Sequence, residues 1–259
     1  MISFEKSVSK VDELKNLWLA CFEEDTRAVD LFFENAMQFA EVYCAKSDEK
    51  IISALYLIGA HLNGKKAHYI FGVATLPEFR GRGIMGNLME YALNDAKQNG
   101  DVYSLLFPAN EKLYNFYAKF GYKANCTAKS RAFTRNELEK FGLADSKDNV
   151  NNILLQNNNF IKFASRYYEI YGIRTLRDEN CFALIEENDN QAEIFYSVYD
   201  DFDSLKRLVL ENTTAQRLVF TGSSADKLYT ECKSERYGMI KSLNDTEIPN
   251  DVYIGITLN

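Results

Sequence analysis

The sequence has 259 residues, of which 30 are Lys or Arg and 37 are Asp or Glu, so its formal net charge is −7. Such an acidic chain is a poor candidate for binding nucleic acid, because that binding depends on neutralising phosphates with Lys and Arg. A hydrophobic content of 46% excludes a disordered protein, and the length suits one large or two small domains. Two His and five Cys without a C-x-x-C spacing give no basis for a metal centre.

The chain also lacks the features of exported and membrane proteins. Its first residues include acidic side chains and no apolar core of a signal peptide, and no stretch approaches the roughly 18 apolar residues of a membrane helix. We therefore expect a cytoplasmic protein that does not enter a membrane and that exists as a monomer or a homodimer.

The first half of the chain alternates helical and strand patterns. Apolar residues recur at helical spacing over 9–22 and 28–40, and two β-rich runs flank the turn Asn63-Gly64-Lys65-Lys66. The elements expected are these two helices, strands at 51–57 and 68–75, a helix at 84–97, a strand at 102–107, a short helix at 111–120 and a strand at 122–133. This order predicts a mixed α/β fold.

The second half repeats this order after a polar connection at 136–159. The elements expected are a helix at 160–171, strands at 181–185 and 192–198, a helix at 201–210, a strand at 217–221, a helix at 225–232, and strands at 238–242 and 252–258. Two similar orders of elements with little residue identity indicate a structural duplication.

A glycine-rich loop between a strand and a helix carries the main functional signal. It reads Arg80-Gly81-Arg82-Gly83-Ile84-Met85-Gly86. Backbone N–H groups of such a loop, with the positive end of the helix dipole, form a site for phosphate oxygens. Two alternatives are a dinucleotide fingerprint, which requires glycine directly after the strand, and a tight turn without a ligand.

Two segments resemble the GNAT superfamily of acetyl-CoA-dependent N-acetyltransferases. In the first, Arg80, Gly83 and Met85 fall on the family pattern R/Q-x-x-G-x-G/A, with Met where Gly or Ala is usual. With Met at this position, the motif resembles that of the group related to the enhanced-intracellular-survival aminoglycoside acetyltransferases. In the second, Asn110-Glu-Lys-Leu-Tyr-Asn-Phe-Tyr-Ala-Lys-Phe-Gly-Tyr122 resembles the later family segment N-x-x-A-x-x-L-Y-x-K-x-G-F.

The resemblance implies a GNAT fold with a mostly antiparallel mixed sheet flanked by helices. It places an acetyl-CoA-binding catalytic domain at 1–133 and a degenerate GNAT-like domain at 134–259. The implied activity is transfer of the acetyl group from acetyl-CoA to a primary amine of a small molecule or a peptide, and the alternative is a protein that binds and senses acyl-CoA without turning it over.

The same resemblance assigns roles to residues of the first domain. Tyr117 corresponds to the general acid of the family, which protonates the leaving CoA thiolate. The implied cofactor-binding residues are Val73, Ala74, Thr75, Arg80, Gly81, Arg82, Gly83, Ile84, Met85, Gly86 and Asn110. For Asn110, the capping of a helix N-terminus is an equally good explanation.

No residue stands out as the general base. His68, Asp30 and Glu34 are the candidates that the sequence offers. In the enhanced-survival relatives the C-terminal carboxylate enters the site, which makes the carboxylate of Asn259 a further hypothesis. The acceptor amine is left open between an aminoglycoside, a polyamine, an amino acid and a peptide.

Overall fold

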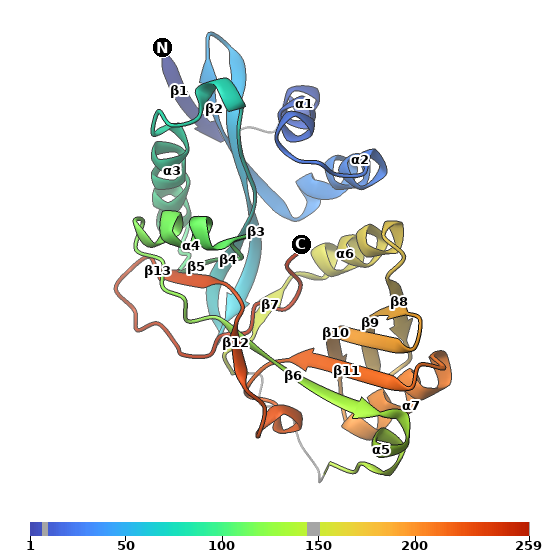
Figure 1. Cartoon of the computed structure of the whole chain (residues 1–259). Helices are drawn as coiled ribbons and strands as arrows, with labels where there is room; N and C mark the ends of the chain where they lie inside the picture. Colours follow the sequence, from blue (N-terminus) through green and yellow to red (C-terminus); the bar gives the residue numbers. More distant parts are fainter. Residues whose placement is uncertain (7–9, 144–150, 259) are drawn as a thin grey trace. The chain divides into compact units, whose positions relative to one another are not determined.

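The computed structural model describes residues 1–6, 10–143 and 151–258 (Figure 1). These residues form two compact units, each assembled from three stretches of chain. The first unit comprises Met1–Ala124, Leu155–Phe163 and Met239–Ile248, and the second comprises Asn125–Leu154, Ala164–Gly238 and Pro249–Asn259. The units are therefore interleaved along the chain, whereas the sequence suggested a single division after residue 133.

The first unit is built on a mixed sheet with the strand order β1-β2-β3-β4-β5-β13. Neighbouring strands are antiparallel except for β4 and β5, which are parallel. The strands are β1 (Ile2–Lys6), β2 (Ala40–Ser47), β3 (Lys50–Leu62), β4 (Lys65–Thr75), β5 (Tyr103–Leu106) and β13 (Met239–Ser242), with β7 (Leu154–Gln156) pairing β3. The expected hairpin is confirmed, because Leu62 pairs with Lys65 around the turn Asn63-Gly64.

Helices cover both faces of this sheet (Figure 1). The helices α1 (Val11–Cys21) and α2 (Thr26–Asn35) lie on one face, and α3 (Ile84–Gln98) lies on the other. The remaining helical elements of the unit are α4 (Glu111–Ala118), the 3₁₀ turns η1 (Ala36–Gln38) and η2 (Pro77–Phe79), and the start of α6 (Asn158–Ile170). The crossover β4-α3-β5 places the loop before α3 at the end of a central strand, where ligand sites of α/β sheets are found.

An aromatic cluster fills the space under α1 and α2. The Trp18 ring, 3% exposed, packs against the rings of Phe32, Tyr56 and Phe71 with centroid distances of 4.8–5.6 Å. Its indole N–H donates a 2.6 Å hydrogen bond to the Glu24 carboxylate. This aromatic cluster therefore anchors the two N-terminal helices to the sheet.

Strand β4 contains a bulge that separates its end from β5. Tyr56 pairs with Phe71 but Ala54 pairs with Ala74, so β4 has one residue more than β3 in this interval. The pairing of β4 with β5 ends at Ile70 and Leu106. The last residues of β4 therefore have no ladder partner on the β5 side.

Gly72 makes this bulge possible, and its replacement is expected to be costly. Its φ is +60°, and a Cβ at this position would lie 2.4 Å from a ring carbon of Trp18. We expect Gly72→Ala to lower the free energy of unfolding by about 3 kcal/mol through overpacking and backbone strain. Gly59→Ala in β3 is the matched control, since a Cβ there meets no atom within 4 Å. Urea midpoints compare the two variants, and equal midpoints would contradict this role of Gly72.

The second unit contains a sheet with the strand order β12-β6-β11-β10-β9-β8. Here too one neighbouring pair, β10 and β11, is parallel, and a register shift in β10 at Ile194–Tyr196 precedes the crossover helix α7 (Phe202–Asn212). The strands are β6 (Thr127–Thr134), β8 (Arg174–Arg177), β9 (Cys181–Asn188), β10 (Gln191–Tyr199), β11 (Arg217–Gly222) and β12 (Ser234–Arg236). The unit also has α5 (Arg135–Lys140), the rest of α6 and η3 (Lys227–Tyr229). Its pairing pattern repeats the pattern of β3, β4, α3 and β5.

Several expected elements differ from the observed ones. The strand expected last in the first half is β6, and it pairs with β11 and β12 of the second sheet because Phe133 packs into that core. The strand expected near residue 240 is β13, which pairs with β5 of the first sheet. The helix expected at 225–232 is the short turn η3, the polar connection contains α5, and the chain at 252–258 is buried without forming a ladder strand.

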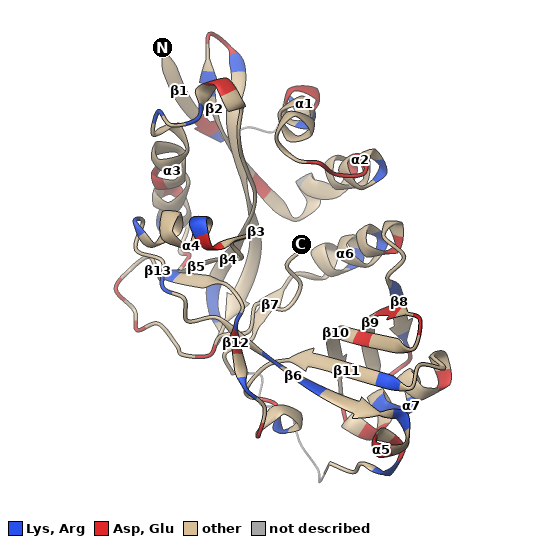
Figure 2. Ribbon diagram, viewed as in Figure 1, with Lys and Arg blue, Asp and Glu red and all other residues tan. Residues whose placement is uncertain are grey.

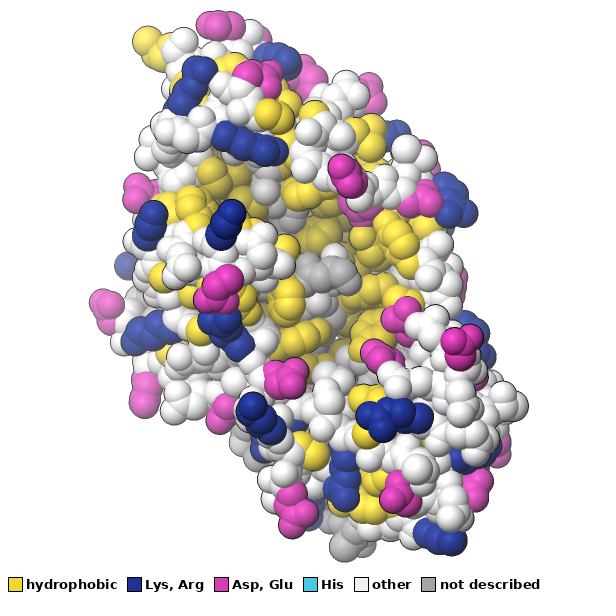
Figure 3. All heavy atoms as spheres, in the orientation of Figure 1, with side chains coloured by type: hydrophobic (Ala, Val, Ile, Leu, Met, Phe, Trp, Pro, Cys, Tyr) yellow, Lys and Arg dark blue, Asp and Glu magenta, His cyan; other side chains and the backbone are white. Residues whose placement is uncertain are grey.

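Charged residues of both signs are interspersed over the helices and strands (Figure 2). Hydrophobic side chains also reach the surface of the face that Figure 3 shows. Within the part of the chain that the structure describes, no helix combines the length and the apolar character needed to cross a bilayer.

Candidate functional site

A cavity of about 430 Å³ opens in the first unit at the end of β4. Three segments that are distant in the sequence form its wall. They are residues 73–75 of β4, the glycine loop with the first turn of α3, and one side of α4, joined by Cys21 and Phe22 at the end of α1. The cavity therefore brings both sequence motifs together.

The glycine loop presents a helix N-terminus to this cavity. Gly81 and Gly83 have φ of +75° and +73°, values that glycine adopts without strain. Gly83 is the N-cap of α3, and because it has no side chain it leaves the first amides of the helix uncapped. Ile84, Met85 and Gly86 all line the cavity. These amides and the positive end of the helix dipole favour an anion at this position.

The two arginines of the loop donate hydrogen bonds to different backbone carbonyls, and only one of them lines the cavity. Arg80 lines the cavity, and its Nε donates a 3.0 Å hydrogen bond to the carbonyl of Thr75. Arg82 donates to the carbonyl of Glu78 at 2.8 Å, and its guanidinium lies 5.2 Å from the centroid of the Phe79 ring. Arg82 is not among the residues that line the cavity. Both side chains brace the loop on its own backbone.

Gly86 has a packing role as well as a place in the cavity wall. A Cβ at this position would lie 3.1 Å from the ring of Phe120. The absence of a side chain therefore lets the first turn of α3 approach the segment that follows α4. Met85, which stands where the family has Gly or Ala, lines the cavity beside it.

The end of β4 forms the opposite wall. Val73, Ala74 and Thr75 line the cavity, and they lie beyond the last residue of β4 that pairs with β5. The carbonyl of Ala74 accepts a 2.8 Å hydrogen bond from Ser53, and that of Thr75 accepts one from the Cys21 thiol at 3.3 Å. These contacts fix the strand end from the β3 side and from α1, while its β5 side faces the opening.

Tyr117 is the ionisable residue of α4 that reaches this cavity. Its side chain is 6% exposed, and it is the residue of α4 that is buried. Burial raises the pKa of the Tyr117 phenol well above its ordinary value, because an apolar surrounding disfavours the phenolate. The phenol therefore stays protonated at neutral pH, as a proton donor must.

Asn110 takes the capping role that the sequence left open. Its Oδ1 accepts a 3.2 Å hydrogen bond from the amide of Leu113, as the N-cap of α4. Asn110 is exposed and is not among the cavity residues. Through this cap it starts the helix that carries Tyr117.

None of the described candidates for a general base lines the cavity. His68 is 1% exposed and contacts Asp101 and Ser104 at 2.6 and 2.7 Å. Asp30 forms an ion pair with Lys15, and Glu34 is exposed on α2. The hypothesis about the carboxylate of Asn259 falls outside the described residues.

Sequence reasoning missed the apolar part of the cavity wall. Phe22, Phe79, Leu113 and Phe116 all line it. Leu113 lies four residues before Tyr117, so the helical period places both side chains on one face of α4. That spacing was the available signal, whereas the contribution of Phe22 depends on the folding of α1 over β4.

The corresponding helix of the second unit, α7, has a capped N-terminus. The N-cap of α7 is Asp201, and its carboxylate accepts hydrogen bonds from the amide and the hydroxyl of Ser204 at 2.8 and 2.7 Å. These hydrogen bonds lower the pKa of Asp201, which keeps it charged at neutral pH. The carboxylate occupies the position at the helix N-terminus that α3 leaves open.

Comparisons with known proteins agree with this architecture. The structure is similar to a conserved protein of unknown function from Enterococcus faecalis, with a TM-score of 0.74 and 14% identity over 94% of this chain and 73% of that one. It is also similar to Eis1 from Mycobacterium abscessus, with a TM-score of 0.69 and 9% identity over 94% and 74%. A GCN5-related N-acetyltransferase from Kribbella flavida gives a TM-score of 0.69 and 15% identity over 94% and 72%.

These likenesses show that the chain shares its fold with these proteins over almost its whole length. No curated protein sequence matches the chain. The family model described as an acetyltransferase (GNAT) domain matches residues 6–124, which contain the glycine loop, β4 and Tyr117. Residues 6–124 therefore form an acetyltransferase (GNAT) domain, and a second sheet domain follows it.

Proposed function

We propose that this protein transfers the acetyl group of acetyl-CoA to a primary amine of a small molecule or a peptide. The observation that carries the proposal is the shared cavity, which joins an uncapped helix N-terminus, a strand end without a ladder partner on its β5 side and a buried phenol. The helix N-terminus suits a phosphate, the strand end suits a chain that contains amides, and the phenol suits a leaving thiolate.

The part of acetyl-CoA from the pyrophosphate to the thioester then has partners on this chain. The amides of Ile84, Met85 and Gly86 hold the pyrophosphate, and the loop glycines let the backbone approach it. The pantetheine amides extend along Val73–Thr75, where β4 has no partner on its β5 side. This arrangement directs the thioester toward Tyr117.

The reaction needs one proton donor on this side of the cavity. The lone pair of a neutral amine forms the C–N bond with the thioester carbonyl carbon, and the C–S bond breaks as the tetrahedral adduct collapses. The Tyr117 hydroxyl donates its proton to the departing sulfur, the surplus proton on nitrogen leaves to solvent, and solvent returns a proton to the Tyr117 phenolate. The products are the acetylated amine and CoA with a free thiol.

A thiol-release assay tests the activity. Purified protein is incubated with acetyl-CoA and, in separate reactions, an aminoglycoside, a polyamine, an amino acid or a peptide. Release of CoA that depends on one of these amines supports the transferase. Tight binding of CoA without amine-dependent release would instead support a protein that senses acyl-CoA.

The two units are expected to differ in binding, with one acetyl-CoA bound per chain. The carboxylate of Asp201 already satisfies the N-terminus of α7 and would repel a phosphate there. Calorimetric titration with acetyl-CoA measures the stoichiometry. Two equivalents bound per chain would show that the second unit retains a site.

A further inference from the structure

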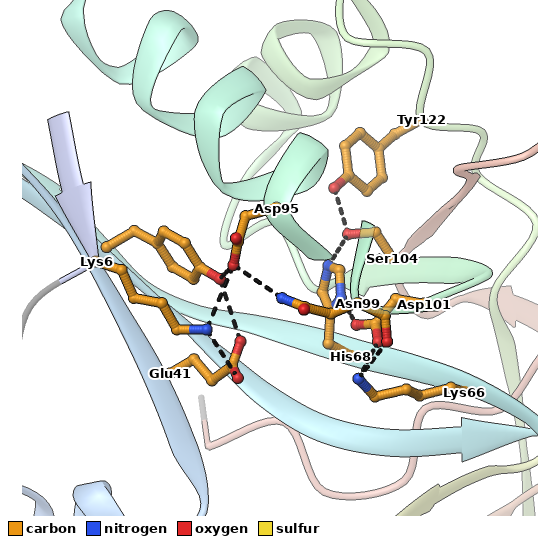
Figure 4. A network of polar contacts seen from close by, with 10 residues as sticks. Lys6, Glu41, Lys66, His68, Asp95, Asn99, Asp101, Ser104 and Tyr122 are labelled. Carbon is orange, nitrogen blue, oxygen red and sulfur yellow. Dashed lines mark hydrogen bonds and ion pairs between the residues drawn. The ribbon is translucent and has the colours of Figure 1, made fainter. Parts of the chain in front are cut away.

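A chain of polar side chains crosses the core of the first unit (Figure 4). The Asp101 carboxylate contacts His68 Nδ1 at 2.6 Å, His68 Nε2 contacts the Ser104 hydroxyl at 2.7 Å, and that hydroxyl contacts the Tyr122 hydroxyl at 2.6 Å. The Lys66 ammonium lies 2.9 Å from the other carboxylate oxygen. Asp101, His68, Ser104 and Tyr122 are between 0 and 7% exposed. Buried polar groups are costly unless each is satisfied, and here each has a partner.

The direction of the first of these hydrogen bonds follows from the charge on Asp101. Burial alone would raise the pKa of Asp101, but the contacts with His68 and Lys66 outweigh it and lower that pKa. The ionised carboxylate accepts the proton of His68 Nδ1. On the other side of the ring, the Ser104 hydroxyl links His68 Nε2 to the Tyr122 hydroxyl.

The chain ends beside Tyr117. The Tyr122 ring packs edge-on against the Tyr117 ring, with a centroid distance of 6.0 Å and an interplanar angle of 67°. The Tyr122 amide also contacts the carbonyl of Tyr117 at 3.4 Å. The polar chain thus reaches the turn that ends α4.

Helix α4 needs such an anchor. It has eight residues, and Tyr117 is its buried side chain. Its other side chains are half-buried or exposed, and the Phe116 ring packs against the Tyr117 ring with a centroid distance of 5.2 Å. Two contacts beyond its C-terminus tie it to the sheet, namely Tyr122 in the polar chain and Lys241 Nζ, which donates to the carbonyl of Phe120 at 2.6 Å.

We propose that Tyr122 is a positioning residue for Tyr117 and that Ser104, His68 and Asp101 hold it in place. This inference rests on the proposed role of Tyr117 as the general acid. Strands β4 and β5 supply the fixed end of the anchor, because His68 and Ser104 lie on them. The polar chain therefore sets the distance between the acid and the thioester that lies along β4.

Tyr122→Phe tests this role, since it removes the hydroxyl and keeps the ring. We expect kcat to fall about tenfold with the KM for acetyl-CoA unchanged, because misplacement of a catalytic group affects the chemical step. Tyr103→Phe is the matched control on β5, where the hydroxyl donates to the carbonyl of Glu247 at 2.7 Å, and its kcat should stay at the wild-type value. An unchanged kcat in Tyr122→Phe would overturn the proposal.

A double-mutant cycle separates this inference from the proposed function. If Tyr122 acts through Tyr117, Tyr122→Phe causes no further loss in a Tyr117→Phe background. An equal loss in both backgrounds would overturn the positioning role and leave the general acid in place. Full activity of Tyr117→Phe alone would instead remove the general acid, and the inference with it.

Histidine NMR provides a readout that does not depend on activity. The sequence has two histidines, and exposed His61 serves as the internal reference for buried His68. The ¹⁵N shifts are expected to show a proton on His68 Nδ1, the nitrogen that faces the Asp101 carboxylate. A His68 ring without a proton on Nδ1 would lose the hydrogen bond to Asp101 and overturn the anchor.

Discussion

Replacement of Tyr117 by phenylalanine is expected to lower kcat about 100-fold or more and to leave the Kd of acetyl-CoA almost unchanged. A positioned general acid contributes roughly 10²–10⁴-fold to the rate. Burial raises the pKa of Tyr117, so the wild-type phenol holds its proton at neutral pH. Phenylalanine fills the same space in the cavity wall but has no proton to donate.

Tyr114→Phe is the control for this experiment. Tyr114 lies three residues earlier on α4 and is not among the residues that line the cavity. Its replacement should leave kcat unchanged. Calorimetry gives the Kd of acetyl-CoA for both variants, and steady-state rates give kcat. Equal rates for wild type and Tyr117→Phe, with both proteins folded, would remove Tyr117 from the mechanism.

A negative charge at the glycine loop should abolish most of the binding. Gly83→Asp places a carboxylate at the N-cap of α3, as Asp201 does at α7. At an effective dielectric constant of about 20, two unit charges about 4 Å apart repel by about 4 kcal/mol. Allowing for screening, we expect the Kd of acetyl-CoA to rise about 100-fold.

Gly83→Asn separates charge from shape in this test. Asn and Asp both tolerate the positive φ that Gly83 adopts, so the backbone cost is shared by the two variants. The Kd of acetyl-CoA should be at least about tenfold lower for the neutral variant than for the acidic one. If both bind with the same Kd, the anion does not lie at this helix N-terminus, and the assignment of the pyrophosphate to the loop is wrong.

Local patterns predicted the parts of the fold that local physics determines. The Asn-Gly turn between β3 and β4 and the apolar stripe of α3 are such features, and both are observed. The glycine loop and Tyr117 were also found from the sequence, because each sits in a short motif with fixed spacing. Their meeting in one cavity depends on the crossover from β4 to β5.

Long-range pairing accounts for most of what the sequence did not predict. The strand β13 pairs with β5, about 130 residues earlier in the chain, and the four residues Met-Ile-Lys-Ser are too short a pattern to specify a partner. By contrast, α5 carried a local signal that the interpretation of a polar connection overlooked. Thr134 and Glu137 form a capping box, in which each side chain bonds to the backbone of the other.

The site shows the same division between local and distant effects. Glycine at 81 and 83 follows from backbone conformation, which the motif encodes. The arginines beside them were expected near phosphates, yet they brace the loop through carbonyls of Thr75 and Glu78. The anchor at Tyr122 was not foreseen, because His68 and Ser104 become neighbours only when β4 pairs with β5.

The most direct test of the central claim is mass spectrometry of the amine after reaction with acetyl-CoA labelled with ¹³C in the acetyl group. The protein is incubated with this donor and a mixture of amines from the four classes named above. We predict that one or more amines gain a single labelled acetyl group with wild-type protein and at least tenfold less with Tyr117→Phe. Bound acetyl-CoA without any labelled amine would contradict the assignment of this protein as an acetyltransferase.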